Sequence, residues 1–535
     1  MAWAWSGCRS ACRPRLNTVS TVRADLLLRG GAVHPLGRFG ARAVTHLAVA
    51  GETVLAVGGR DLESLRGPRT RVVELEGRCV LPGFDDAHAH VVYYGLTSFG
   101  ADLTGSRSLA ELWDRIRRVH ARLAPGRWLV ARGYSAVELA EGRPPVREEL
   151  DAVVGDRPMY ADERGGHSRV ASTAALALAG LGPATPDPVG GSLGRRPDGS
   201  LDGRLIESAM RLVSDHQPPP DFQERMTGIL RCQRLLLSRG ITAVGAAVNR
   251  GFADDLAAFQ ELADRGRLKL RVNEFLSWEL LPAAGGLGLR RGFGGGRVRA
   301  GPIKVFVDGG AAAGAVALRG AADQLWRTPP EDLKRLVAEA SAAGLQVAAH
   351  AVGDGAIAAF CDAVEAAGPA GSRLRHRVEH CTACPPDLQA RLARLGMAAV
   401  MQPLFASVGR SRAGGAFPDA LRPHLAAHRA LLRAGVPLAF SSDLPVVADP
   451  DPWAGIAAAV NDPQGALTLL QALRAYTAGG AYVAFAERER GTLETGKLAD
   501  FQVLDADPFR VPSEKWPGLR PSAVAVGGAP VWGAF

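Results

Sequence analysis

Short apolar segments alternate with longer helical segments through most of this chain, and this alternation constrains the fold more than any other feature. The segments with the length and composition of buried strands are the one around His88 and His90 and residues 241–246, 268–275, 303–307, 345–350, 375–380, 398–402 and 437–442. Helical patterns over residues 332–343, 355–367 and 386–395 separate several of them. The pattern predicts an α/β fold, a (β/α)8 TIM barrel, with its reactive groups at the C-terminal strand ends.

The remaining segments predict additions to this barrel. Strand-like alternation over residues 24–80 returns in residues 490–535, so we expect both chain ends to form one discontinuous small β-sandwich. The barrel then occupies residues 81–489, with an insertion of about residues 102–225 after its first strand, which is too long for one βα loop. Residues 1–23 contain arginines and no acidic residue, and we expect a disordered leader there.

Composition excludes several classes of protein. With 47% hydrophobic residues the chain can bury a sizeable core, and it contains no apolar run of transmembrane length. The formal net charge of +9 comes almost wholly from scattered arginines, without the clustered basic motifs of nucleic-acid-binding domains. The seven cysteines are odd in number and sparse, which is typical of reduced thiols in a cytoplasmic protein. We therefore expect no nucleic-acid or membrane partner, and leave open whether the chain forms a homodimer.

The first barrel segment contains a pair of candidate metal ligands. Residues two apart on a strand point to the same face, so His88 and His90 would project together, and Asp86 shares their parity. The apolar residues 91–94 that follow suit a continuation of the extended, buried segment. Two nearby histidines are often only solvated or hydrogen-bonded side chains, so the interpretation depends on further ligands elsewhere in the chain.

Four further residues that can bind metal occur in or at the ends of later predicted strands: Lys304, His350, His380 and Asp443. Each alone has an ordinary explanation as a satisfied polar residue. A lysine inside an apolar strand is costly unless something neutralises it, however, and all four fall on nearby barrel strands. Histidine, carboxylate and a modified amine suit Zn²⁺ or a similar divalent ion.

These residues lie in motifs that resemble the amidohydrolase superfamily, in particular amidohydrolase family 3, a branch that includes enzymes similar to N-substituted formamide deformylase. The resemblance covers roughly residue 24 to the C-terminus. The motifs are Pro82-Gly83-Phe84, His350-Ala351-Val352-Gly353-Asp354, Arg377-Val378-Glu379-His380, Gln402-Pro403, Ser442-Asp443-Leu444-Pro445-Val446, Tyr476-Thr477-Ala478 and residues 491–501.

The resemblance implies a role for each ligand. His88 and His90 would bind the more buried metal beside Asp443, His350 and His380 would hold a second metal, and Lys304 would bridge both as a carbamate formed with CO₂. One or two divalent ions are expected, Zn²⁺ before others. A metal-activated water would attack the substrate carbonyl, and Asp443 would take its proton and pass it to the leaving nitrogen.

Three residues are expected to bind substrate: His167, Asp308 and Gln402. His167 has the alternative of a surface turn residue, and Asp308 that of a cap for the next helix. The expected function is metal-dependent hydrolysis of a non-peptide C–N bond in a small amide- or formamide-type molecule. Two alternatives stay open: a non-catalytic scaffold or regulator on the same barrel, and a metal-dependent isomerase or lyase.

Overall fold

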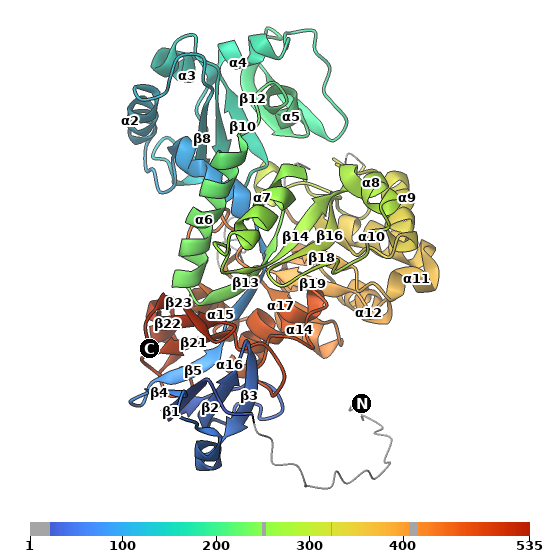
Figure 1. The fold of residues 1–535 in the computed structure, drawn as a ribbon. Coiled ribbons are helices and arrows are strands. Elements are labelled where there is room, and N and C mark those ends of the chain that lie inside the picture. The colour runs from blue at the N-terminus through green and yellow to red at the C-terminus, as the bar shows by residue number, and fades with distance from the viewer. Residues whose placement is uncertain (1–21, 249–252, 323, 406–415) are drawn as a thin grey trace.

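A computed structural model describes residues 22–248, 253–322, 324–405 and 416–535. The expected leader, residues 1–23, lies almost wholly outside them. Figure 1 shows three layers: an insertion at the top, a barrel in the middle, and a sheet built from both chain ends at the bottom. None of the described helices is long and apolar enough to cross a membrane.

The middle layer is a parallel barrel of eight strands, as the alternation predicted. Neighbouring strands pair in parallel in chain order, from first to last. They are β6 (Phe84–Ala89), β13 (Ile241–Ala246), β14 (Arg271–Ser277), β16 (Val298–Phe306), β17 (Val347–Ala351), β18 (Arg377–His380), β19 (Ala398–Met401) and β20 (Leu438–Phe440). The ring is nearly closed. Asp443 donates its N–H to the His88 carbonyl at 2.9 Å, and His90 donates to the Leu444 carbonyl at 2.8 Å.

Helices cover the outer face of this barrel. They are α6 (Phe222–Ser238), α7 (Ala253–Asp264), α8 (Leu281–Gly286), α9 (Pro330–Ala342), α10 (Asp354–Ala366), α11 (Gly368–Ser372), α12 (Pro386–Arg394), α14 (His428–Arg433), α15 (Pro452–Val460), α16 (Leu469–Arg474) and α17 (Gly480–Val483). Apolar strand residues such as Val347 and Ala349 share one buried cluster with helix residues such as Leu333 and Phe360. Polar side chains are thereby left to the strand ends and the barrel interior.

One local expectation was wrong. Residues 91–94 are not extended, because a helix, α1 (Val91–Leu96), begins directly after His90. A short apolar run does not by itself distinguish a strand from a buried helix. Here α1 packs closely on α6 at paired glycines, where a Cβ on Gly95 would lie 2.2 Å from the Gly228 backbone. The strand therefore ends at the second histidine.

Both chain ends pair into one sheet of eight strands. Its strands are β1 (Leu26–Val33), β2 (Val44–Ala50), β3 (Thr53–Gly58), β4 (Arg71–Glu74), β5 (Cys79–Pro82), β21 (Phe501–Leu504), β22 (Pro521–Val526) and β23 (Ala529–Gly533). Phe501 pairs with Pro82 and Leu504 with Cys79, so the C-terminal strands continue the N-terminal sheet. The two-layered sandwich and the domain boundaries stay predictions.

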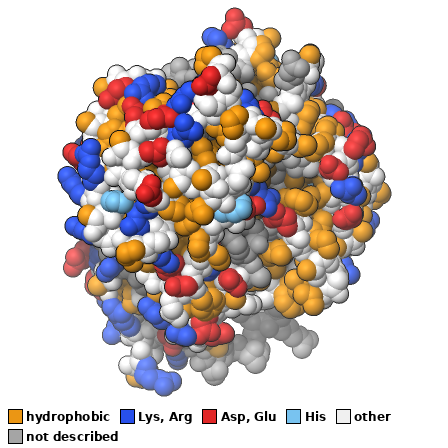
Figure 2. All heavy atoms as spheres, turned by 90° about the horizontal axis from the view of Figure 1, so that it is seen from above, with side chains coloured by type: hydrophobic (Ala, Val, Ile, Leu, Met, Phe, Trp, Pro, Cys, Tyr) orange, Lys and Arg blue, Asp and Glu red, His pale blue; other side chains and the backbone are white. Residues whose placement is uncertain are grey.

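The insertion has its own six-stranded sheet. Its strands are β7 (Ala101–Asp102), β8 (Leu129–Tyr134), β9 (Met159–Glu163), β10 (Ser168–Ala171), β11 (Gly191–Arg195) and β12 (Leu201–Glu207), with helices α2 (Leu109–His120), α3 (Arg147–Val154), α4 (Thr173–Leu178) and α5 (Ala209–Ser214). Seen from above, acidic, basic and apolar side chains are interspersed over this face (Figure 2). The arginines on that face are therefore mixed with carboxylates.

Candidate metal centre

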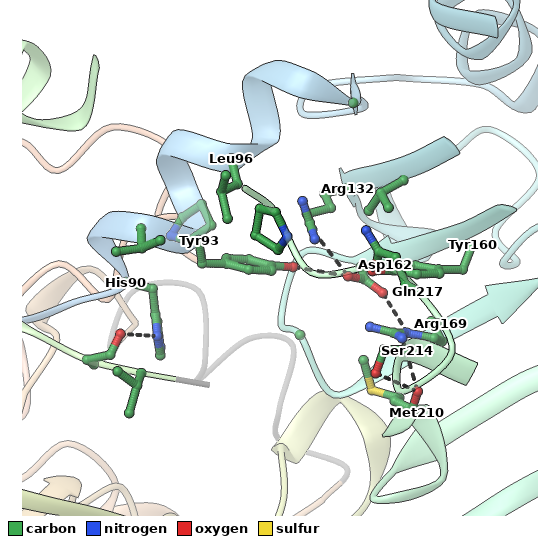
Figure 3. A pocket seen from close by; sticks show the side chains of 18 of the residues that line it. His90, Tyr93, Leu96, Arg132, Tyr160, Asp162, Arg169, Met210, Ser214 and Gln217 are labelled. Carbon is green, nitrogen blue, oxygen red and sulfur yellow. Dashed lines mark hydrogen bonds and ion pairs between the residues drawn. The ribbon is translucent and has the colours of Figure 1, made fainter. Parts of the chain in front are cut away.

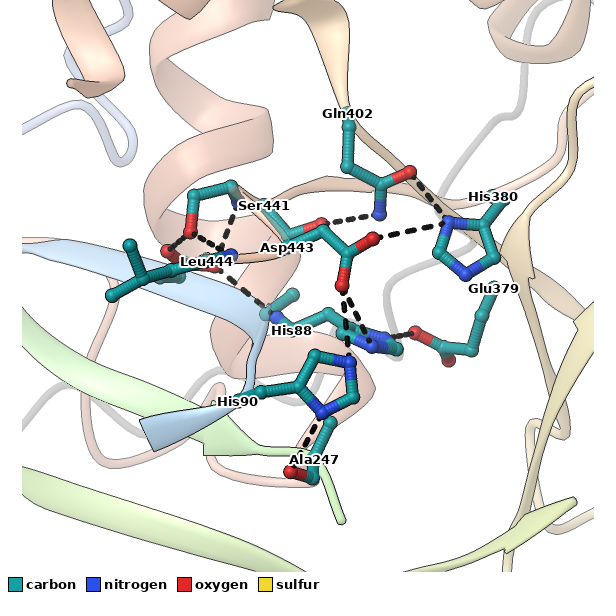
Figure 4. A network of polar contacts seen from close by, with 12 residues as sticks. His88, His90, Ala247, Glu379, His380, Gln402, Ser441, Asp443 and Leu444 are labelled. Carbon is teal, nitrogen blue, oxygen red and sulfur yellow. Dashed lines mark hydrogen bonds and ion pairs between the residues drawn. The ribbon is translucent and has the colours of Figure 1, made fainter. Parts of the chain in front are cut away.

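The C-terminal ends of the barrel strands bring the predicted metal ligands together. His88 and His90 of β6 lie beside Asp443, which follows β20, and a ligand atom from each of the three falls within 4.8 Å of the others. Nε2 of His90 lies 3.2 Å and Nε2 of His88 3.4 Å from Oδ1 of Asp443 (Figure 4). The His350 and His380 ring centroids are 4.5 Å apart, and the His380 ring is 5.4 Å from that of His88.

Hydrogen bonds at the far side of each β6 histidine fix its orientation. Nδ1 of His88 lies 2.5 Å from Oε2 of Glu379, which is fully buried, and Nδ1 of His90 lies 3.1 Å from the Ala247 carbonyl oxygen. A carboxylate or carbonyl acceptor requires a proton on Nδ1. In both rings Nε2 is thereby the nitrogen left with a lone pair, and it faces Asp443.

The other two histidines are held in a similar way. Nδ1 of His380 lies 2.9 Å from Oε1 of Gln402, whose amide donates to the Ser441 hydroxyl at 2.9 Å. Nε2 of His350 lies 3.3 Å from the Gly309 carbonyl oxygen. These contacts leave Nε2 of His380 and Nδ1 of His350 as the nitrogens available to a ligand. Gln402, predicted to bind substrate, therefore orients a histidine in this structure.

The backbone around Asp443 is specialised. Asp443 has φ of 55°, in the left-handed region that non-glycine residues rarely adopt, and His380 has φ of 71°. The preceding Ser442 donates its N–H at 3.0 Å and its hydroxyl at 2.6 Å to the two carboxylate oxygens of Asp86. Asp86, which shares the parity of the β6 histidines, therefore anchors the loop that presents Asp443.

Lys304 of β16 lines the same cavity as His350, His380 and Asp443. Its side chain is 2% exposed, and Nζ lies 4.7 Å from the Phe306 ring centroid without a hydrogen-bond partner in the described residues. Burial lowers the pKa of Lys304 to about 8, against the opposing charges of Glu379 and Asp443.

The electrostatics favour neutral histidines around an ionised aspartate. Burial lowers the pKa of His88 and of His350 well below the ordinary value, and it also lowers that of His380. Burial alone would raise the pKa of Asp443, but the close contacts with the rings of His90, His88 and His380 outweigh it, so the net shift is downward. Neutral imidazole and carboxylate are the forms that ligate a metal.

The residues present fit a divalent cation. His88 Nε2, Lys304 Nζ and Asp443 Oδ1 are all buried and all lack a hydrogen-bond partner within the described parts of the chain. Such groups are costly to bury unpaired, and a cation between them would pair two of the three directly. The second ring nitrogen of each histidine already has its acceptor, which is the usual arrangement around metal-bound imidazole.

Two predicted substrate-binding residues lie in different surroundings. His167, from the insertion, lines the cavity with its ring centroid 5.2 Å from that of His350, and its Nδ1 lies 2.8 Å from Oε1 of Glu207. Asp308 is fully buried and lies outside the cavity lining. Its carboxylate accepts the N–H groups of Val352 (3.0 Å), Gly353 (2.8 Å) and Ala317 (3.1 Å), so it orders the loop after β17.

The cavity that opens from the metal ligands extends between barrel and insertion. Its volume is about 330 Å³. Lys304, His350 and Asp443 line the barrel side, and Arg132 and Asp162 line the insertion side. Figure 3 shows the wall that leads from His90 past Tyr93 to the insertion. A cavity of this size accommodates a small molecule.

Sequence reasoning missed Glu379 and its partner Arg377. Arg377 donates to both carboxylate oxygens of Glu379, at 2.5 and 3.1 Å, and to the Ala87 carbonyl at 2.7 Å. The signal was present, because two charged residues inside a four-residue buried strand require partners. Glu207 was also not assigned to the site, whereas Arg132 was expected either to line the pocket or to pack within the insertion, and it lines the cavity.

Comparison with known proteins agrees with this centre. The model of the amidohydrolase family (Amidohydro_3) matches residues 71–532. The chain is 28% identical to the N-substituted formamide deformylase of Arthrobacter pascens, over 85% of this chain and 90% of that protein. It is also 28% identical to the protein LONG AFTER FAR-RED 3 of Arabidopsis thaliana, over 94% and 90% of the two chains.

Among solved structures, an uncharacterized metal-dependent hydrolase from Pyrococcus furiosus superposes with a TM-score of 0.72 at 29% identity, covering 91% of this chain and 100% of the other. Together with the His88, His90 and Asp443 group, these findings support a hydrolase that depends on a divalent metal. The chain belongs to the amidohydrolase family.

Proposed function

We propose that this protein hydrolyses a non-peptide C–N bond of an amide- or formamide-type small molecule. The observation that carries the proposal is the convergence of three buried, unpartnered atoms from separate strand ends: Nε2 of His88, Nζ of Lys304 and Oδ1 of Asp443. Two of the three residues, Lys304 and Asp443, line a cavity of about 330 Å³. The relative from Arthrobacter pascens, whose name describes deformylation of N-substituted formamides, supports the bond type.

His88, His90, His350, His380 and Asp443 would hold the divalent metal, and Lys304, converted to a carbamate, would supply a further anionic ligand. A divalent ion, Zn²⁺ before others, would activate water as the nucleophile and polarise the substrate carbonyl. Carbamate formation joins the neutral Lys304 amine to the carbon of CO₂ and releases one proton. The product is an anionic oxygen ligand at a buried position where Nζ has no hydrogen-bond partner.

Asp443 is the group that moves the proton. Its Oδ1 contacts both β6 histidines, and its Oδ2 lies 3.9 Å from Nδ1 of His380, so the carboxylate spans the centre. The downward shift of its pKa keeps it ionised and ready to accept a proton from the attacking water. It then donates that proton to the leaving nitrogen, which departs as an amine.

The walls of the cavity orient the substrate. Glu207 holds Nδ1 of His167 at 2.8 Å, which leaves Nε2 of His167 as the ring nitrogen available for a ligand. Arg327 is fixed by the same carboxylate, at 3.2 Å, and lies over the Phe306 ring at 4.2 Å. Both groups stand beside His350 and would contact the acyl portion of the substrate.

A substrate screen tests this proposal. Protein loaded with Zn²⁺ is incubated with N-formyl amines, N-acyl amino acids and cyclic amides, and release of amine or acid is followed. We expect hydrolysis of at least one of the three classes, with Asp443→Asn inactive on the same compounds. Hydrolysis by Asp443→Asn at the wild-type rate would contradict the assignment of the base. A cytoplasmic location stays a prediction, as does a homodimer.

A further inference from the structure

The insertion side of the cavity contains an excess of positive charge. Arg132 of β8 and Arg169 of β10 share a single carboxylate, that of Asp162 on β9. Arg169 donates from Nε to Oδ1 of Asp162 at 2.8 Å, whereas Nε of Arg132 lies 3.5 Å from Oδ2 and makes no hydrogen bond within the described residues. Tyr93 also donates its hydroxyl to Oδ2, at 3.1 Å (Figure 3).

These groups are shielded from water. The exposed fractions of the side chains are 15% for Arg132, 8% for Arg169 and 2% for Asp162. Two guanidinium groups against one carboxylate leave a net positive charge in a largely water-excluded place, which is unfavourable unless another anion joins it. The Tyr93 ring, 4.5 Å from the Arg132 guanidinium carbon, supplies a weaker attraction than an anion would.

The other arginines of the cavity differ from Arg132. Apart from Arg169, each is matched to a carboxylate that no second arginine shares. The pairs are Arg127 with Glu224, Arg164 with Glu138, Arg211 with Glu279, Arg225 with Asp255 and Arg327 with Glu207. Arg132 is therefore in a different position from the other described arginines that line the cavity. Its nearest carboxylate, that of Asp162, is already bound more closely by Arg169.

Arg132 also lines the same cavity as His90, His350, His380 and Asp443. Tyr93 lies between the two parts of the cavity wall in contact terms. Its ring centroid is 6.4 Å from that of His90 and 4.5 Å from the Arg132 guanidinium carbon. A single small molecule that fills this cavity can therefore contact both the barrel ligands and the Arg132 guanidinium. Guanidinium recognises carboxylates through two parallel hydrogen bonds.

We propose that Arg132 binds a carboxylate of the substrate, so that the preferred substrates are amides bearing a free carboxylate, such as N-acyl amino acids. This inference rests on the proposed function and names the substrate class for it. The acyl carbon would lie among the barrel ligands, and the carboxylate would lie against β8 of the insertion. Neutral N-alkyl formamides would lack the second anchor.

The test compares matched pairs of N-acetyl and N-formyl amino acids, of both configurations, with their uncharged C-terminal carboxamides. Dissociation constants are measured by calorimetry on metal-loaded protein, and kcat/KM is measured where hydrolysis occurs. We expect the carboxylates to be favoured about 10- to 100-fold, the range of a hydrogen bond to a charged group. Arg132→Met should abolish this preference. Arg132→Lys should keep part of it, because lysine retains the positive charge but cannot make the two parallel hydrogen bonds of a guanidinium.

Arg127→Met is the matched control, since Arg127 lines the same cavity but is paired with Glu224 at 2.6 Å. It should retain the full carboxylate preference. Equal binding of acids and carboxamides by the wild type, or an unchanged preference in Arg132→Met, would overturn the inference. If Arg132→Met fails to fold, Arg132→Lys decides, because an undiminished preference there also overturns it. Binding without hydrolysis would contradict the proposed function and leave the carboxylate site supported.

Discussion

Glu379 gives the sharpest prediction about how the centre is held. It is fully buried and accepts from His88 at 2.5 Å and from Arg377 at 2.5 and 3.1 Å. In Glu379→Gln one carboxylate oxygen is replaced by an NH₂ group. This group cannot accept a hydrogen bond, so it faces a donor of His88 or Arg377 without bonding to it. The variant therefore loses at least one charge-assisted hydrogen bond and leaves the Arg377 charge without its counterion.

Two magnitudes follow. Breaking one side of a buried ion pair costs about 3–5 kcal/mol of stability. A group that orients a metal-bound histidine contributes about 10- to 100-fold to metal affinity, which corresponds to about 1.4–2.7 kcal/mol. Stability is measured by thermal unfolding of the chelator-treated protein. Affinity is measured by competition with a chromophoric chelator, under conditions where the variant remains folded.

Asp85→Asn is the matched control for this experiment. Asp85 is also on β6 and pairs with Arg490 at 2.9 Å, with exposed fractions of 5% and 8%, but neither group contacts a metal ligand. It should lose stability while binding metal as the wild type does. Wild-type metal affinity in Glu379→Gln, or an equal loss in Asp85→Asn, would refute the account of how His88 is held.

Three further predictions concern turnover, the bridge and pH. Asp443→Asn should lower kcat by about 10²- to 10⁴-fold while most of the metal remains bound, measured by steady-state kinetics and elemental analysis. Lys304→Ala should lose metal and activity, with partial recovery of both in acetate or propionate; full activity without either acid would contradict a carbamate. Burial lowers the pKa of His376 to about 4, so the unfolded chain binds the extra proton, and stability should fall by about 3 kcal/mol as pH drops from 6.5 to 4. In chemical denaturation, His376→Gln should show a flatter pH profile, and an unchanged slope would contradict this assignment.

The sequence predicted those parts of the structure that depend on local periodicity. Residues 241–246 were expected as a strand and form β13, and residues 398–402 were expected where β19 lies. Strand ends place their side chains at one rim of the barrel, so Lys304, His350 and Asp443 could be assigned to a common centre before their contacts were known. The prediction of an extended segment over residues 91–94 was wrong, because a short apolar run is compatible with a buried helix as well as with a strand.

What the sequence left out depends on contacts between distant segments. Glu379 looked like an ordinary member of β18 until its contact with His88, 291 positions away, was known. Arg132 acquires its significance only because β8 of the insertion lies over the barrel and because Arg169 competes for Asp162. Such relations are set by tertiary packing, which has no local period.

The most direct test of the central claim is a metal titration of chelator-stripped protein. Zn²⁺ is added in steps, bound metal is counted per chain, and hydrolysis of the best compound from the amide screen is followed in the same samples. We predict that activity rises in proportion to bound metal and saturates at one or two ions per chain, while His88→Ala with His90→Ala binds less metal and stays inactive. Full activity of the stripped protein, or a metal-loaded protein that hydrolyses no amide in the screen, would contradict a metal-dependent amidohydrolase.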